Sequence, residues 1–488
     1  MARNFQALIQ GCDSDIRSGK PQDVARRLRP VGVSGVPREF RLPLANICRR
    51  AGLYSLGLKL LRHVVRAKSP ASAGERASYA MLLLRTGAIK EAIDRLQQID
   101  GSEVPELLLY RAWAHFLCWE YQAAIPLLES YLKTDLKPYA SLVAKTNLAY
   151  AYGDSRKNEL ALRLHDENIK TAKVEGNLQL QATSHALKAQ VFIQMNDLSA
   201  ARNELNRAQN LFPAQQGNDH FIMIKWSLIL SGLETKSLEP FDALKKIAIK
   251  NREWEACREA DFYRLKVDYN RELFIHLYFG TPFAEFREHV ARELGGAPTQ
   301  DMYVFGPKAS PRFDLRTGQI DGGPILNAGK KTHRLLEVLL RDLYQPLNVA
   351  GIFSALFPDE CYDVANSGER VRQLIHRARA WIKESNIPVQ ILEEHGFYRI
   401  HIEGAFSFRI PLHRPSIESF AADLEQIQKL FAAQSFLAHD VQTRLQLPKS
   451  RVRLLLQRGI EKGLILRHGT TNRSACYVVA RSIAKKAA

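Results

Sequence analysis

Positively charged side chains recur along one side of the segment from Glu369 to Glu384. An apolar set at the spacing of one helical face predicts an amphipathic helix here: Val371, Leu374, Ile375, Ala378 and Ile382. The polar and basic positions outside that face are Arg370, Arg372, Gln373, His376, Arg377, Arg379 and Lys383. Such a helix can pack through its apolar face while its cations meet phosphate groups. The chemistry predicted from these residues is DNA binding.

The elements around this helix are predicted from local patterns. Residues 389–391 and 397–400 have the composition of strands, and Glu393 to Gly396 that of the turn between them, which predicts a β-hairpin. Upstream, residues 302–305 and 312–315 are predicted as short strands, and residues 332–343 and 349–356 as helices. A strand pair, three helices and a hairpin follow one another in the order of a winged helix.

Three motifs carry a family resemblance: His333-Arg-Leu-Leu-Glu-Val-Leu-Leu, Arg370-Val-Arg-Gln-Leu-Ile-His-Arg-Ala-Arg and Gly396-Phe-Tyr-Arg-Ile. Residues from about 300 to 405 resemble the winged-helix effector domain of the OmpR/PhoB response-regulator family. In that family the third helix enters the major groove and the wing reaches the adjacent minor groove. By position, Arg377 and Arg379 match arginines of the recognition helix, Arg399 matches the wing arginine, and Arg370 matches a DNA-contacting helix start. The resemblance predicts a domain over residues 300–412.

Two features depart from that family. The wing usually has Gly immediately before the Tyr, where this chain has Phe397. A receiver domain with a phospho-acceptor aspartate normally precedes the winged helix, whereas helical repeats precede it here. Phospho-relay control is therefore not implied. The acidic loop from Pro358 to Gly368 either contacts a polymerase or links two helices, and the second interpretation is favoured.

A second winged helix is predicted over residues 416–488. Ala438 to Leu447 followed by Arg451 to Ile465 is similar to a helix-turn-helix of the MarR type, and Leu466 to Val479 supplies the wing. Gly459 departs from the pattern, because such helices usually carry Leu there. Candidate DNA contacts are Lys449, Arg451, Arg453 and Arg458 on the helix and Arg467 and Arg473 on the wing.

The charge distribution agrees with a polyanionic partner. The chain has 488 residues, a formal net charge of +18 and a pI near 9.6. Residues 1–66 contain 13 Lys and Arg against 4 Asp and Glu, residues 67–300 contain 29 against 29, and residues 301–488 contain 27 against 18. The last 60 residues are the most basic, with 12 against 2. The N-terminal excess is interpreted as a solvated repeat face.

A helical repeat is predicted over residues 1–295. A residue that ends one helix is followed five positions later by Ala or Gly, in the pairs Gly52–Gly57, Gly87–Ala92, Trp119–Ala124, Arg156–Ala161 and Asn196–Ala201. The spacing and the close-packing small residue resemble tetratricopeptide (TPR) repeats. Residues 217–294 lose this signature and are either degenerate repeats or a capping bundle. Trp226, Trp254 and Tyr263 are predicted as core residues.

No catalytic or metal-binding motif is recognised. Gly329-Lys330-Lys331-Thr332 superficially resembles a phosphate loop, but Pro324 occupies the first glycine position and Lys331 the required Ser/Thr position. The six cysteines lie far apart, without the paired spacing of a zinc site or redox pair. No signal peptide or membrane span is recognised. We therefore expect no enzyme activity, no cofactor, no metal and no membrane, and a cytoplasmic, nucleoid-associated bacterial protein.

These patterns together predict a mainly α protein, with a TPR-like α-solenoid followed by two winged-helix (α+β) domains. The protein is predicted to be a transcriptional regulator that binds double-stranded DNA in a sequence-specific manner. Its repeats would bind a protein or peptide, or a second copy of the chain to form a homo-oligomer. The alternative is a non-catalytic TPR scaffold whose winged helices mediate protein–protein contacts. RNA binding is a third option, although no aromatic stacking platform is recognised.

Overall fold

The structure is a computed structural model. It describes residues 4–17, 21–65, 71–101, 104–211, 218–307, 311–315, 317–321, 330–358, 360–412, 424, 426–428, 430–431, 434–445, 447, 449–461, 464–469 and 475–480. None of the helices among these residues is long and apolar enough to cross a membrane. The fold is mainly helical, with three small sheets in the C-terminal part.

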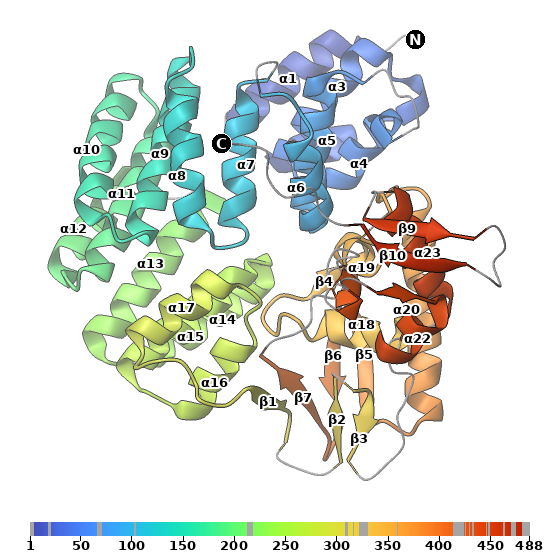
Figure 1. Ribbon diagram of the computed structural model, residues 1–488. Helices are drawn as coiled ribbons and strands as arrows, with labels where there is room; N and C mark the ends of the chain where they lie inside the picture. Colours follow the sequence, from blue (N-terminus) through green and yellow to red (C-terminus); the bar gives the residue numbers. More distant parts are fainter. Residues whose placement is uncertain are drawn as a thin grey trace, which may run out of the picture.

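The N-terminal part is an array of helices in which each helix from α5 to α15 packs on its neighbours along the chain (Figure 1). The array comprises α1 (Phe5–Arg17), α2 (Pro21–Leu28), α3 (Arg38–Arg50), α4 (Tyr54–Leu60), α5 (Ala73–Arg85), α6 (Ile89–Gln97), α7 (Glu106–Phe116), α8 (Tyr121–Leu132), α9 (Pro138–Asp154), α10 (Asn158–Val174), α11 (Leu178–Gln194), α12 (Leu198–Leu211), α13 (Asn218–Thr235), α14 (Glu239–Asn251), α15 (Trp254–Val267), α16 (Arg271–Phe279) and α17 (Ala284–Glu293).

The predicted repeat is confirmed residue by residue. All five residues expected to end a helix have positive φ: Gly52 (74°), Gly87 (83°), Trp119 (64°), Arg156 (61°) and Asn196 (62°). All five small residues that follow are buried: Gly57, Ala92, Ala124, Ala161 and Ala201. The left-handed residue reverses the chain, and the small residue lets the next helix approach closely. The array is therefore TPR-like.

The repeat continues beyond residue 217, so the degenerate-repeat interpretation is favoured. Lys236 has a φ of 53°, and Phe241 follows five residues later with no exposed surface. Phe241 fits because its partner helix carries Gly232, where an added Cβ would lie 2.5 Å from the Phe241 Cζ atom. In this pair the small residue, Gly232, lies on the first helix, and the large residue, Phe241, lies on the second. An Ala or Gly five residues after the turn therefore does not mark this repeat.

A unit with two sheets follows the array. Its elements are β1 (Met302–Phe305), β2 (Arg312–Asp314), β3 (Gln319–Ile320), α18 (Lys331–Leu339), β4 (Leu347–Asn348), α19 (Val349–Leu356), α20 (Ser367–Glu384), β5 (Val389–Glu394), β6 (Phe397–Ile402) and β7 (Ser407–Pro411). One sheet has the order β1-β7-β2-β3 and the other β4-β6-β5. The β2–β7 pair is parallel and the remaining pairs of both sheets are antiparallel.

Three local expectations for this unit were wrong. Helix α18 ends at Leu339 and not at residue 343, because the Asp342 carboxylate accepts hydrogen bonds from the backbone of Tyr344 (2.9 Å) and Gln345 (3.1 Å) and forms a turn. Strand β4 has only two residues and was not predicted. Strand β7 was also missed, because the alternation of Ser407, Phe408, Arg409 and Ile410 covers only four positions before Pro411.

The last elements form a separate small unit. They are β8 (Ser435–Phe436), α22 (Ala438–Leu445), α23 (Lys449–Glu461), β9 (Ile465–His468) and β10 (Cys476–Val479), with the sheet order β8-β10-β9. Their apolar core includes Leu424, Phe436 and Leu455. Gly459 is buried, and an added Cβ there would lie 2.6 Å from Ile465 Cδ1. Close packing of α23 on β9 therefore explains the glycine at this position.

Candidate functional site

The predicted basic helix is α20, which begins at Ser367, two residues before the predicted start. Its five predicted apolar residues are all buried, and Trp381 is buried with them. The opposite side is exposed and carries every predicted contact residue of this helix: Arg370, Arg372, Gln373, His376, Arg377 and Arg379. Burial of the apolar face against α18 and α19 fixes the orientation of α20 and turns its cations outward.

Two arginines lie at the edges of the exposed face and are engaged by their own unit. The guanidinium of Arg370 donates to Glu360 Oε1 at 3.0 Å and lies over the ring of Phe357, 4.3 Å from its centroid. The hydrogen bond to Glu360 raises the pKa of Arg370. Arg379 donates through Nε and Nη2 to the carbonyl of Ile391 at 3.2 and 2.7 Å, so it joins α20 to the hairpin.

The centre of the face is less constrained. Arg372 forms an ion pair with Glu369 at 3.2 Å, and both side chains are more than half exposed, at 59% and 60%. Arg377 donates to the Gln373 carbonyl only at 3.4 Å. Ion pairs this exposed contribute about 0–1 kcal/mol, so an incoming phosphate can replace the carboxylate at little cost.

Sequence reasoning missed a cation from another helix. Lys331, at the start of α18, is exposed, and its Nζ lies 3.8 Å from the centroid of Phe357. Partial burial lowers the pKa of Lys331, and the positive charges of Arg370 and Arg377 lower it further. These groups therefore share one positive field. The basic surface, as we define it, consists of Lys331, Arg370, Arg372, His376, Arg377 and Lys383.

The predicted hairpin is present, with a tighter turn than expected. Strands β5 and β6 meet at a two-residue turn, His395 (φ 54°) and Gly396 (φ 83°), and not at a four-residue turn from Glu393. Arg399, the predicted wing arginine, is exposed and pairs with Glu394 at 2.8 Å.

The departure at Phe397 has a structural explanation. Its ring lies 6.1 Å from that of Trp254 on α15, and the Arg252 guanidinium is 5.5 Å from its centroid. Trp254 lies half-buried at the junction of the array and the hairpin, so the prediction that it belongs to the core was wrong. Trp226 and Tyr263 are buried as predicted. Where the family has a glycine, the Phe397 ring makes aromatic and cation–π contacts with the array.

The candidate contacts of the last unit are described only in part. Arg453 on α23 and Arg467 on β9 are exposed. Lys449, Arg451 and Arg458 belong to α23, but their side chains lie outside the description, and Arg473 lies outside the described residues altogether. Within the described residues, no group of three or more His, Cys, Asp or Glu side chains is placed to hold a metal ion.

Comparisons with known proteins give matches among the solved structures alone. No family model matches the chain, and no curated protein matches it. Similar solved structures include a Rap protein complexed with competence and sporulation factor, with 11% identity over 60% of this chain and 89% of that chain and a TM-score of 0.41. The C-terminal part of a TPR repeat-containing protein from Cytophaga hutchinsonii has 13% identity over 54% and 97%, with a TM-score of 0.28. The TPR domain of P58(IPK) has 13% identity over 78% and 99%, with a TM-score of 0.20.

Proposed function

We propose that this chain is a sequence-specific transcriptional regulator that binds double-stranded DNA through the basic surface and the β5–β6 hairpin. The observation that carries the proposal is the asymmetry of α20. Its apolar face is fully buried, while its whole opposite face is exposed, carries cations and is joined by Lys331 of α18. A face that binds another protein does not need this many cations. A face that binds the phosphates of DNA does need them.

The element order supports a winged-helix assignment for residues 300–412 similar to the OmpR/PhoB type. In this assignment α20 is the recognition helix and the β5–β6 hairpin is the wing. The order β8, α22, α23, β9 and β10 supports a second, MarR-like winged helix within residues 416–488. The array over residues 1–295 is the proposed site for a protein or peptide partner, or for a second copy of the chain. A bacterial nucleoid-associated location would follow.

The contacts made by each side chain suggest different roles on DNA. Gln373, His376 and Arg377 occupy the centre of the exposed face, from which side chains can reach base edges in the major groove. Arg372 can exchange its exposed carboxylate partner for a phosphate. Arg379 is proposed as a positioning residue, because its guanidinium holds the Ile391 carbonyl of the hairpin. The six candidate residues of the last unit would contact the DNA backbone: Lys449, Arg451, Arg453, Arg458, Arg467 and Arg473.

A scaffold is the second candidate, and one observation favours it. The hairpin tip packs against Trp254 of the array through Phe397, so this unit already makes a protein contact where a wing would meet DNA. The TPR-like array agrees with a protein-interaction role. The two functions differ in what the basic surface does, since a scaffold needs no duplex there.

The double variant Arg372→Gln/Arg377→Gln separates them. We expect its affinity for a duplex enriched from a random pool to weaken by about 1–3 kcal/mol through the lost base contact of Arg377, and the salt slope to decrease by about 1 through the lost phosphate contact of Arg372. Fluorescence anisotropy on the full chain measures this decrease. The matched control is Arg163→Gln, which removes an exposed arginine that pairs with Glu167 on α10. Equal decreases in the control and the double variant, or no decrease in either, would rule out the basic surface as the DNA site.

A further inference from the structure

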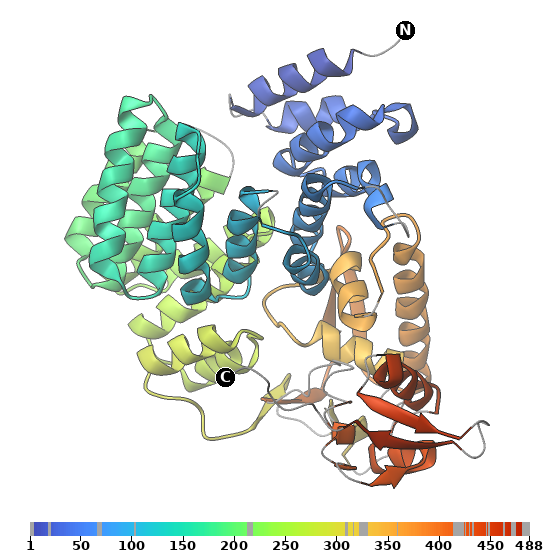
Figure 2. The same ribbon diagram turned by 45° about the horizontal axis from the view of Figure 1, so that its top comes forward.

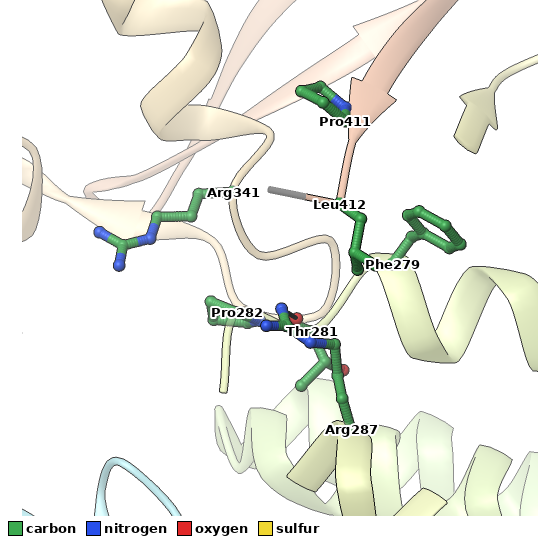
Figure 3. A pocket seen from close by; sticks show the side chains of 7 residues that line it. All are labelled: Phe279, Thr281, Pro282, Arg287, Arg341, Pro411 and Leu412. Atoms are coloured by element: carbon green, nitrogen blue, oxygen red, sulfur yellow. Dashed lines mark hydrogen bonds between the residues drawn. The ribbon is translucent and has the colours of Figure 1, made fainter. Parts of the chain in front are cut away.

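The array meets the sheet unit near each of its two ends, and the two contacts differ in chemistry. Near the end of the array, Phe279 and Leu412 line a pocket of about 170 Å³ in which Arg341 points away from Arg287, so these cations do not converge on one ligand (Figure 3). Near the start of the array, its side chains hold the chain between α19 and α20. We call residues 360–363 the acidic segment, since it begins with a glutamate and ends with an aspartate.

The acidic segment places a carboxylate on two cations of the basic surface. Arg370 donates to both carboxylate oxygens of Glu360, with Nη2 at 3.0 Å from Oε1. Lys331 and Arg370 both lie against the buried ring of Phe357, with Nζ at 3.8 Å and Cζ at 4.3 Å from its centroid. Burial lowers the pKa of Lys331, as does the charge of Arg370, whereas the Glu360 carboxylate opposes this decrease. One anion therefore acts on both cations, and that anion belongs to the chain itself.

The array fixes the backbone of the acidic segment. The backbone N–H of Tyr362 donates to Glu91 Oε2 on α6 at 2.8 Å, and the Tyr79 hydroxyl on α5 donates to the Tyr362 carbonyl at 3.0 Å. Arg62 donates to both carboxylate oxygens of Asp363, at 3.0 and 2.7 Å. The Tyr362 side chain is buried in the core that the array and the sheet unit share. Side chains of the array thus determine the path of the chain two and three positions after the carboxylate.

This attachment decides how strongly Glu360 competes with DNA. A phosphate needs the same donors of Arg370 that Glu360 uses. The two side chains of this ion pair are 45% and 47% exposed, and a pair so exposed contributes little by itself. A carboxylate on a fixed backbone nevertheless stays at high effective concentration beside its cation, so it competes better than a freely moving one.

We propose that the acidic segment is an autoinhibitory element: Glu360 occupies a phosphate-binding subsite formed by Lys331 and Arg370, and the array holds it there. This regulation rests on the proposed DNA-binding function of the basic surface. A partner that separates Arg62 from Asp363 would loosen the acidic segment and make Arg370 available to one more phosphate. The coupling is reciprocal, so bound DNA would in turn favour the loosened segment.

Fluorescence anisotropy of the full chain on random duplex DNA, from about 50 to 200 mM salt, tests the inhibition. Glu360→Gln should bind about fivefold more tightly than the wild type at the lowest salt, since one competing ion pair is removed. Its slope of log affinity against log salt should be steeper by about 0.9, because Arg370 then neutralises one more phosphate. The matched control, Glu403→Gln, removes the same charge from an exposed carboxylate that accepts from Gln390, and should bind as the wild type does.

Arg62→Gln tests the part played by the array. It should increase the affinity for DNA even though it removes a cation, because it loosens the acidic segment. In the Glu360→Gln background the same substitution should give no increase, since the competing carboxylate is already absent. Arg163→Gln, which removes an exposed array arginine paired with Glu167, should give no increase in either background.

The outcomes separate this regulation from DNA binding itself. Steep salt dependence with equal affinities of Glu360→Gln and the wild type overturns the autoinhibition and leaves the DNA-binding function intact. Tighter binding by Glu360→Gln without any increase from Arg62→Gln overturns the role of the array. Absence of binding by all variants at the lowest salt overturns both the DNA-binding function and its regulation.

Discussion

At the scale of single residues, Arg258 on α15 is a fully buried cation that depends on its ion-pair partners. Its side chain has no exposed surface, and its guanidinium contacts Asp342, Glu255 and Thr281. Burial alone would lower the pKa of Arg258, but the two carboxylates raise it overall. A buried charge of this kind is tolerated only while its partners remain in place. No sequence pattern reveals the pair, because Arg258 and Asp342 lie 84 positions apart.

Replacing this residue with methionine should be strongly destabilising. Arg258→Met keeps the volume but leaves the buried Asp342 carboxylate without its partner, which costs about 3–5 kcal/mol of unfolding free energy. Urea unfolding followed by circular dichroism measures the change. Arg264→Gln, which breaks an exposed pair with Asp242, is the matched control and should cost about 0–1 kcal/mol. If both variants were destabilised equally little, Arg258 would not be a structural cation.

At the scale of elements, local patterns correctly predicted the five repeat turns and the helices α19 and α20. The apolar stripe of α20, the strand β1 and the left-handed turns at Gly52 and Asn196 all follow from neighbouring residues. What sequence could not show depends on partners distant in the chain. Strand β7 is placed by pairing with β1 and β2, and Lys331 joins the basic surface only because α18 packs against α20.

The α13–α14 pair gives a prediction at the same scale. Gly232→Ala should destabilise the array by about 1–3 kcal/mol, because its Cβ would lie 2.5 Å from Phe241 Cζ. Phe241→Ala should cost about 3–5 kcal/mol by opening a cavity. In the double variant the methyl group introduced at position 232 enters the vacated space, so the destabilisation should be smaller than the sum by about 0.5–3 kcal/mol. Strict additivity in thermal unfolding would show that the two sites do not exchange volume.

At the scale of the whole molecule, the array curves so that helices near its start and near its end both contact the sheet unit (Figure 2). Near the start, Arg62 pairs with Asp363 at 2.7 Å and the Tyr79 hydroxyl donates to the Tyr362 carbonyl at 3.0 Å. Near the end, Phe397 packs on Trp254. One apolar core accordingly contains residues of α3 to α6 and of α18 to α20.

This closed arrangement places the array beside the hairpin while leaving the basic surface exposed. Three of the residues through which the sheet unit meets the array, Tyr362, Asp363 and Phe397, flank α20 in the sequence but do not belong to the basic surface. A partner bound to the array beside Arg62 or Trp254 would therefore lie next to the unit that carries α20. No local pattern could indicate this proximity, since the Arg62–Asp363 pair spans 301 positions.

The central claim is that the basic surface binds duplex DNA, and the salt dependence of binding tests it most directly. Retention of the full-length chain on random duplex DNA is measured from about 50 to 200 mM salt. Each neutralised phosphate contributes about −0.9 to the slope of log affinity against log salt, so engagement of half of the six side chains of the basic surface predicts a slope of about −3 or steeper. A slope near zero, or no retention at the lowest salt, would contradict DNA binding and leave the scaffold function.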